Sequence, residues 1–354
     1  MKYNLFQRRN EFMELLKKLT QTPGIPGREE PIAELIKEEM NQICDEVWVD
    51  PLGSVIGLKK GNGNKKVMVA GHMDEIGFIV KHIDKNGFIR LQPVGGFDPR
   101  SLMAQRVIVH GKEDLIGNLA PATKPIHVLS PEEKKKQLQV KDYFVDLGLS
   151  GEKVKELVEI GDPVTLKQDF EEIGNMYSSK SLDDRVGVYV MLEAAKQLKD
   201  HDADIYLVAT SQEEVGIRGA MTSSYGIEPD VGIALDVTIA ADTPGSEESE
   251  QVTKLGEGAA IKIMDSASIT NRKVLQTLKD LANEKDINHQ MEILPKGGTD
   301  AGSIQRSKSG IPVGTISIPC RYVHTVNEMI HKEDLDASVN LLSAFLAEAN
   351  FNEF

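Results

Sequence analysis

The sequence predicts an α/β fold, in which an α/β/α sandwich surrounds a mixed central sheet and a small β-rich segment is inserted. Three observations support this prediction. From residue 183 onward, apolar spacing typical of helices alternates with short apolar strands. The run Val231–Leu235 lacks polar alternation, which is typical of a strand covered by helices on both faces. Between residues 76 and 167, by contrast, short β runs are separated by turns. These patterns favour a layered α/β part and a separate β part.

The chain is expected to open with two amphipathic helices. Apolar residues recur at helical spacing over Phe12–Leu19 and again over Ile32–Ile43, where Pro31 suits the first helical turn. Valine and isoleucine residues on both sides of the turn Asp50–Gly53 predict a hairpin. The apolar run Lys66–Ala70 then predicts a short buried strand.

The inserted segment is predicted to be a separate domain that covers residues 76–166. The remaining residues, 1–75 and 167–354, would then form one discontinuous domain. The elements expected in the insertion are strands at 78–80, 88–91 and 107–109, an exposed loop at 121–125 and a helix at 132–136. Behind it we expect helices at 186–198, 271–284 and 335–349 and strands at 205–209, 231–235 and 313–318.

The composition is that of an acidic globular protein. Among 354 residues, 41 Lys and Arg stand against 55 Asp and Glu, which gives a net charge of −14. This charge would repel the phosphates of a nucleic acid, so we expect no nucleic-acid partner. No stretch reaches the roughly 18 apolar residues of a membrane helix, and the first ten residues lack the apolar segment of a signal peptide. Neither Cys44 nor Cys320 belongs to a CxxC pair. We therefore expect a cytoplasmic protein without a disulfide framework or a thiolate zinc site.

Acidic residues and histidines follow four of the predicted strands, at the edge where ligands bind in open α/β sheets. A fifth acidic group, Asp183-Asp184, precedes a predicted helix. Each group alone has a simpler interpretation: a lone histidine is more often structural, an Asp pair suits a helix cap, and a Glu pair is commonly solvated. Five such groups at one sheet edge favour a metal site instead. The candidate residues are His72 and Asp74, Asp183, Glu213 and Glu214, Asp236, and His324.

The residue types indicate which metals and which chemistry to expect. Two histidines and three carboxylates form a nitrogen and oxygen ligand set that suits zinc, cobalt or manganese and is too poor in sulfur for structural zinc. If one aspartate bridges, each of two divalent metal ions receives three protein ligands, and metals roughly 3.5 to 4 Å apart activate a shared water. Hydrolysis then needs one further carboxylate as a base. In the adjacent pair Glu213-Glu214, one side chain can bind metal while the other remains free for this task.

The motifs are more specific as a set than singly. In chain order they are His72-Met73-Asp74, Leu182-Asp183-Asp184-Arg185, Gln212-Glu213-Glu214-Val215-Gly216, Asp236, Gly297–Gly302 and Ser317–His324. In this order and spacing, over essentially the whole chain, the set resembles the glutamyl/deblocking aminopeptidase family of dinuclear metallopeptidases. That family includes the tetrahedral aminopeptidases, and some of its members have been labelled endoglucanases.

The resemblance implies a ligand set for two metal ions. His72 and Asp236 would bind one ion, Glu214 and His324 would bind the other, and Asp183 would bridge the two. The activity implied is the hydrolysis of N-terminal residues from peptides.

The resemblance also implies roles around the metals. Glu213 would be the general base, and Asp74 would accept a hydrogen bond from His72 and so fix its tautomer. The peptide bond between Asp183 and Asp184 would be cis. The insertion resembles the family's PDZ-like dimerisation domain, and such dimers commonly assemble into a twelve-subunit shell.

An aminopeptidase must also hold the free amino terminus and the first side chain of its substrate. Thr299 and Asp300 lie in a glycine-flanked loop that lets backbone approach a ligand, although an ordinary glycine turn explains them too. Lys262 and Lys296 offer positive charge, unless they are solvated surface lysines. These four residues are the candidates for substrate binding, and the lysines suggest a preference for Glu or Asp at the amino terminus.

Two other functions remain open at this point. One is an amidohydrolase or deacylase that applies the same two-metal chemistry to non-peptide amides, and the other is a metal-binding scaffold without catalysis. An insertion directly behind the first ligand fits the aminopeptidases better, because the extra domain of the deacylases typically follows the glutamate pair. Cys320 stands where the family often has Thr, and we interpret it as a buried cysteine and not as a ligand.

Overall fold

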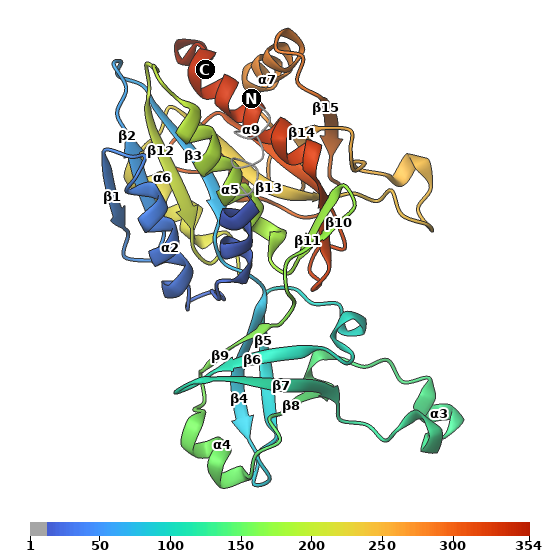
Figure 1. Cartoon of the computed structure of the whole chain (residues 1–354). Helices are drawn as coiled ribbons and strands as arrows, with labels where there is room; N and C mark the ends of the chain where they lie inside the picture. Colours follow the sequence, from blue (N-terminus) through green and yellow to red (C-terminus); the bar gives the residue numbers. More distant parts are fainter. Residues whose placement is uncertain (1–12) are drawn as a thin grey trace.

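The computed structural model describes residues 13–354 and has a large α/β body with a smaller all-β unit beneath it (Figure 1). The body is built on an eleven-stranded sheet. Nine strands follow one another in the order β1 (Glu46–Val49), β2 (Val55–Lys59), β12 (Asp204–Thr210), β3 (Lys66–His72), β13 (Val231–Ile239), β16 (Val313–Arg321), β17 (Glu328–His331), β11 (Met176–Ser179) and β10 (Glu171–Ile173). The other two are β14 (Ala259–Met264), which pairs with β16, and β15 (His289–Ile293), which pairs with β14.

The four strands in the middle of this sheet are parallel, the strands next to them are antiparallel, and β14 and β15 at one side pair in the parallel sense. β12, β3, β13 and β16 are parallel neighbours, whereas β2 pairs with β12 and β17 pairs with β16 in the antiparallel sense. The sheet is therefore mixed, as predicted. The hairpin predicted around Asp50–Gly53 is also confirmed, as strands β1 and β2.

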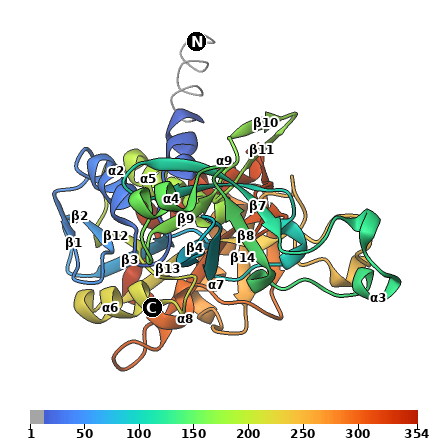
Figure 2. The ribbon, with the colours of Figure 1, turned by 90° about the horizontal axis from the view of Figure 1, so that it is seen from below.

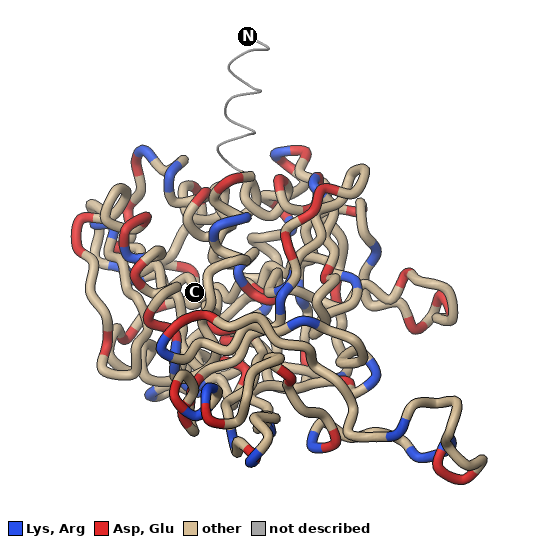
Figure 3. Tube along the Cα trace, turned by 60° about the horizontal axis from the view of Figure 1, so that its bottom comes forward, with Lys and Arg blue, Asp and Glu red and all other residues tan. Residues whose placement is uncertain are grey.

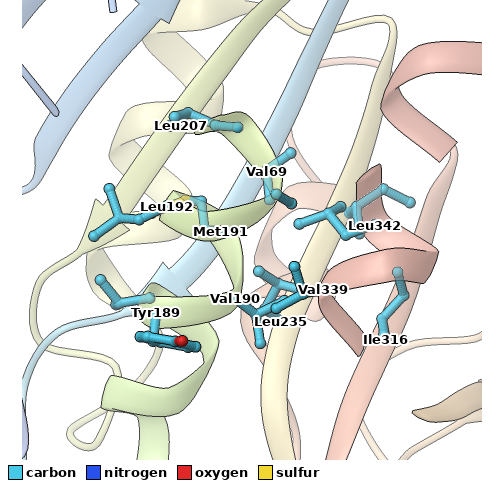
Figure 4. Packing of buried hydrophobic residues seen from close by; sticks show 14 of the residues in the cluster. Val69, Tyr189, Val190, Met191, Leu192, Leu207, Leu235, Ile316, Val339 and Leu342 are labelled. Atoms are coloured by element: carbon cyan, nitrogen blue, oxygen red, sulfur yellow. The ribbon is translucent and has the colours of Figure 1, made fainter. Parts of the chain in front are cut away.

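Helices cover both faces of the sheet because its strands are apolar on both sides. In β3, Val67 and Val69 belong to one buried cluster, while Met68 and Ala70 belong to another. Figure 4 shows the first cluster, where side chains of α5 and α9 pack against Val69 and other strand residues. The helices on that face are the helical residues 13–21, α2 (Glu30–Met40), α5 (Leu182–Gln197), α7 (Arg272–Glu284) and α9 (Lys332–Glu348), and those on the other are α6 (Arg218–Ile227) and α8 (Asp300–Gln305). The α/β/α sandwich is thus confirmed.

The all-β unit is a closed antiparallel barrel with its own buried cluster, which includes Phe78 and Val107. Seen from below, it lies in front of the body, and the segment around α3 (Pro131–Lys134) projects to one side (Figure 2). A second short helix, α4 (Gly151–Leu157), was not predicted. Around the barrel the strands are β4 (Gly77–Ile83), β5 (Ile89–Val94), β8 (Tyr143–Asp146), β7 (Asp114–Pro121), β6 (Arg106–His110) and β9 (Pro163–Leu166).

Several predicted bounds differ from the observed ones. β3 continues past Ala70 and ends at His72, and β13 continues past Asp236 because its ladder with β16 extends to Ile239. Asp236 therefore lies within a strand and not behind it. Phe12, at the start of the first predicted helix, lies outside the described residues, whereas residues 13–21 are helical.

Charged residues of both signs are interspersed along the chain (Figure 3). Within residues 13–354, no helix combines the length and the apolar character that crossing a membrane requires. Cys320 is buried in the core of the body, and its thiol donates to the carbonyl of Arg321 over 3.4 Å.

Candidate active site

Residues from four parallel strands meet at one edge of the sheet. His72 is the last residue of β3, Glu213 and Glu214 follow the end of β12, Asp236 lies near the end of β13, and His324 follows β16. Because these strands are parallel neighbours, their carboxyl ends reach the same edge. The structure thus brings together the residues that the sequence predicted at these strand ends.

Asp183 enters the same place from the first turn of α5 and lies between two histidines. Its Oδ1 is 3.0 Å from Nε2 of His72, and its Oδ2 is 3.3 Å from Nε2 of His324. Oε1 of Glu214 is also 3.3 Å from Nε2 of His324. The peptide bond between Asp183 and Asp184 is cis, as the resemblance implied. The two oxygens of Asp183 thus each face one imidazole.

Among residues 13–354, two groups of donor atoms are compact enough to hold a metal ion. In each group the donor atoms lie within 4.8 Å of one another: His72, Asp183 and Glu214 form the first, and His72, Asp184 and Asp236 form the second. All donors are imidazole nitrogens or carboxylate oxygens. This donor set fits zinc, cobalt or manganese.

The electrostatics of these side chains also fit bound cations. Burial raises the pKa of Asp236 well above its usual range, and the Asp183 carboxylate raises it further. Burial likewise raises the pKa of Glu213, where His72 opposes the shift and Asp236 adds to it. For His324, burial disfavours the charged imidazole, but hydrogen bonds to carboxylates outweigh this and raise its pKa to about 12. Divalent cations at this position would keep the clustered carboxylates ionised.

Asp74 positions its neighbours through both its backbone and its side chain. The backbone carbonyl of Asp74 is 3.0 Å from Nδ1 of His72, whereas its carboxylate Oδ1 is 3.6 Å away. The carboxylate instead accepts the backbone N–H groups of Glu213, at 2.9 Å, and Glu214, at 3.1 Å. Nδ1 of His72 therefore lies closer to the backbone carbonyl of Asp74 than to the carboxylate for which the resemblance implied the hydrogen bond, and the carboxylate holds the glutamate pair.

A cavity of about 570 Å³ opens over these residues. His72, Asp183 and Glu213 line it, together with Gly96–Asp98 behind barrel strand β5 and Lys296–Thr299 behind β15. A larger cavity, of about 700 Å³, lies between β1, β2, β12 and α6. None of the candidate site residues lines that larger cavity.

The structure brings two of the four predicted substrate-binding residues to the cavity. Thr299 and Lys296 line it, and Lys296 is exposed. Lys262 does not line it: this residue is fully buried, and its Nζ lies 3.0 Å from Oε1 of Glu292. Asp300 does not line it either, because it begins α8 and its carboxylate accepts a hydrogen bond of 2.6 Å from a threonine hydroxyl.

Two carboxylates at the site escaped the sequence reasoning. In the sequence Asp184 stands out only as part of an acidic pair, yet its carboxylate accepts the backbone N–H of His72 at 3.1 Å and that of Gly187 at 3.0 Å. A Cβ atom at Gly187 would collide with this carboxylate, so glycine is required there. Glu328 was missed because a single Glu at the start of a strand carries no motif, although its position four residues behind His324 is visible in the sequence.

Comparisons with known proteins find relatives along almost the whole chain. Residues 53–341 match the family described as M42 glutamyl aminopeptidase. A lysyl aminopeptidase of Pyrococcus furiosus is 36% identical over 350 residues, which cover 96% of this chain and 98% of that protein. The structure of an aminopeptidase from the archaeon Desulfurococcus kamchatkensis matches with a TM-score of 0.93 and 43% identity, covering 97% of this chain and 96% of that one. A Pyrococcus horikoshii peptidase that can assemble into a tetrahedron or a large octahedral shell matches with a TM-score of 0.85 and 33% identity, covering 96% of this chain and 100% of that one. The chain belongs to the M42 glutamyl aminopeptidase family.

Proposed function

We propose that this aminopeptidase removes N-terminal residues from peptides with two divalent metal ions and with Glu213 as the general base. One observation carries the proposal. The two oxygens of Asp183 face His72 and His324, while the Glu213 carboxylate lies 3.9 Å from Nε2 of His72, beyond hydrogen-bond distance. A pair of metal positions and a carboxylate held beside them are the parts that metal-assisted hydrolysis requires.

The ligand set for the two ions follows the implied one. His72 and Asp236 would hold one ion, Glu214 and His324 would hold the other, and Asp183 would contact both. Zinc and cobalt suit these donors, and manganese is acceptable. When bound, the ions would lower the pKa of a water molecule and polarise the carbonyl of the scissile bond.

The protein's own groups perform the proton transfer and the positioning. Glu213 takes the proton from the attacking water and passes it to the nitrogen of the leaving group. Asp74 holds the backbone of Glu213 through its carboxylate and orients the ring of His72 through its carbonyl. A preference for an acidic first residue stays a prediction, and it now depends on Lys296 alone, because Glu292 pairs with Lys262.

We also propose how the chain is organised and assembled. Residues 76–166 would form the dimerisation domain, and residues 1–75 and 167–354 would form the catalytic domain. Dimers would assemble into a dodecamer, which the shell-forming Pyrococcus horikoshii peptidase supports. A cytoplasmic location is supported by the acidic composition and by Cys44 and Cys320, which are both free.

Turnover on matched substrates tests the function. The protein, stripped of metal and reloaded with Zn²⁺, Co²⁺ or Mn²⁺, is given aminoacyl p-nitroanilides with a free or an acetylated amino group. We expect metal-dependent hydrolysis of the free form only. Hydrolysis of N-acyl amino acids without turnover of any free aminoacyl anilide would instead support a deacylase.

A further inference from the structure

Glu328 holds the backbone of two proposed metal ligands at once. Its Oε2 accepts the N–H of Asp183 at 3.0 Å, and its Oε1 accepts the N–H of His324 at 2.8 Å. Glu328 is 2% exposed and is the first residue of β17, where it pairs with Ser179 of β11. A single buried carboxylate therefore joins the loop behind β16 to the start of α5, a segment 145 residues earlier in the chain.

Neither the N–H of Asp183 nor that of His324 has an acceptor of the kind that a regular helix or a side-chain cap supplies. Asp183 lies at the start of α5 with non-helical backbone angles (φ −76°, ψ 109°), and Ser181, at the cap position, makes no side-chain cap. The N–H of Asp183 therefore needs an acceptor from elsewhere in the chain. His324 has a φ of 63°, in the left-handed region that non-glycine residues rarely adopt. Its backbone must therefore be held by its surroundings, and Glu328 does this.

Other buried carboxylates around the site also accept backbone N–H groups of proposed ligands. The Asp74 carboxylate accepts the N–H groups of Glu213 and Glu214, and the Asp184 carboxylate accepts the N–H of His72. Buried carboxylates thus fix the backbone from which several of the metal-binding side chains project. Among these carboxylates, Glu328 bridges the largest separation in sequence, because its partner Asp183 lies near the start of residues 167–354 and its partner His324 lies towards their end.

We propose that Glu328 is a positioning residue, which sets the separation of Asp183 and His324 and thereby the affinity for the metal ion that these two residues share. The inference rests on the proposed function. Oδ2 of Asp183 lies 3.3 Å from Nε2 of His324. Both side chains project from residues whose backbone N–H groups donate to the Glu328 carboxylate. Because bonds between zinc and its nitrogen or oxygen ligands are only about 2.0 to 2.2 Å long, small shifts of either ligand weaken the site.

Two variants separate the reach of this side chain from its two acceptor oxygens. Glu328→Gln keeps the length but has one acceptor oxygen, so its amide nitrogen faces one of the two N–H donors. Glu328→Asp keeps both carboxyl oxygens but is one methylene shorter, so it does not reach both donors. A matched control is Asp334→Asn: Asp334 is fully buried and accepts the N–H groups of Gly256 at 2.8 Å and Gly258 at 2.7 Å, and neither partner is a proposed ligand.

The test measures Co²⁺ binding by the full-length, metal-free proteins, by equilibrium dialysis and by the visible absorption of bound Co²⁺, with circular dichroism as the check of folding. We expect both Glu328 variants to lose about 10- to 100-fold in affinity for one ion and to show an altered spectrum. Asp334→Asn should keep the wild-type affinity and spectrum, whatever stability it loses. If Glu328→Gln does not fold, Glu328→Asp decides the matter.

Wild-type affinity and spectrum in the folded Glu328 variants would overturn the inference, as would an equal loss of affinity in Asp334→Asn. A failure of the proposed function gives a different result. In that case the wild-type protein itself binds no Co²⁺ and turns over no aminoacyl anilide, whereas failure of the inference alone leaves wild-type binding and turnover intact.

Discussion

Replacing Glu213 by Gln removes the proposed base and preserves the shape of the site. The Glu213 side chain is 12% exposed and makes its closest ion-pair contact at 3.9 Å, with Nε2 of His72, so an amide of the same size fits without a new contact. The neighbouring carboxylate does not replace it, because Oε1 of Glu214 is 3.3 Å from His324. General base catalysis contributes about 10²- to 10⁴-fold, which corresponds to about 3 to 5 kcal/mol of transition-state stabilisation. We expect kcat to fall by that factor while both metal ions remain bound.

The assay follows the release of p-nitroaniline from Leu-, Glu- and Lys-p-nitroanilide at saturating metal, and elemental analysis gives the metal content. Glu214→Gln is the matched control, because it makes the same change one residue further along. It should lower the metal content as well as the rate. A kcat within tenfold of wild type at full metal content would refute the role of Glu213 as base, and a loss of metal equal to that of Glu214→Gln would make Glu213 a ligand.

Three further predictions concern the metal, the pH dependence and the core. Asp183→Ala should release at least one ion, and full metal loading by elemental analysis would contradict the bridging role. Burial raises the pKa of Asp334 to about 6, although backbone N–H groups oppose this, so the folded carboxyl holds its proton more tightly than the unfolded one. Its contribution to stability is fully present below the unfolded pKa of 3.8 and is lost as the pH rises through about 6. Between pH 3.8 and about 6, the wild-type Tm should accordingly fall relative to the Tm of Asp334→Asn, and above about pH 6 the difference between the two Tm values should stay constant. A difference that is constant at all pH values would contradict the raised pKa of Asp334. Phe345 is fully buried beside Phe351 and Phe354. Its replacement by Ala should lower the free energy of unfolding of the protein by about 3 to 5 kcal/mol. A loss under about 1 kcal/mol in urea denaturation would contradict this and show that the surrounding core collapses into the space left by the ring.

The parts of the site that the sequence predicts are those with a local signal. A ligand such as His72 or Glu214 lies directly behind an apolar run, and the parallel pairing of such runs brings their ends together without any knowledge of the loops. Asp236 was placed correctly at this edge, although the strand continues beyond it. The layers of the body follow from the same local patterns of apolar residues.

What the sequence does not disclose depends on contacts between distant segments. Lys262 lies in an apolar run and resembles a solvent-facing lysine, but the pairing of β14 with β15 brings it against Glu292 and buries both. Asp300 resembles part of a flexible glycine loop, because α8 is too short to show helical periodicity. The contact between Glu328 and Asp183 is equally invisible, since 145 residues separate the two.

The two points at which the barrel joins the body lie close to the candidate site. The chain leaves the central sheet directly behind His72, passes through the barrel and returns along β10 and β11 to Asp183. The two chain connections of the barrel therefore lead to two residues whose side chains lie 3.0 Å apart. Gly96–Asp98, behind barrel strand β5, also lines the cavity. The barrel is thus tied to the candidate site both through the chain and through the cavity wall.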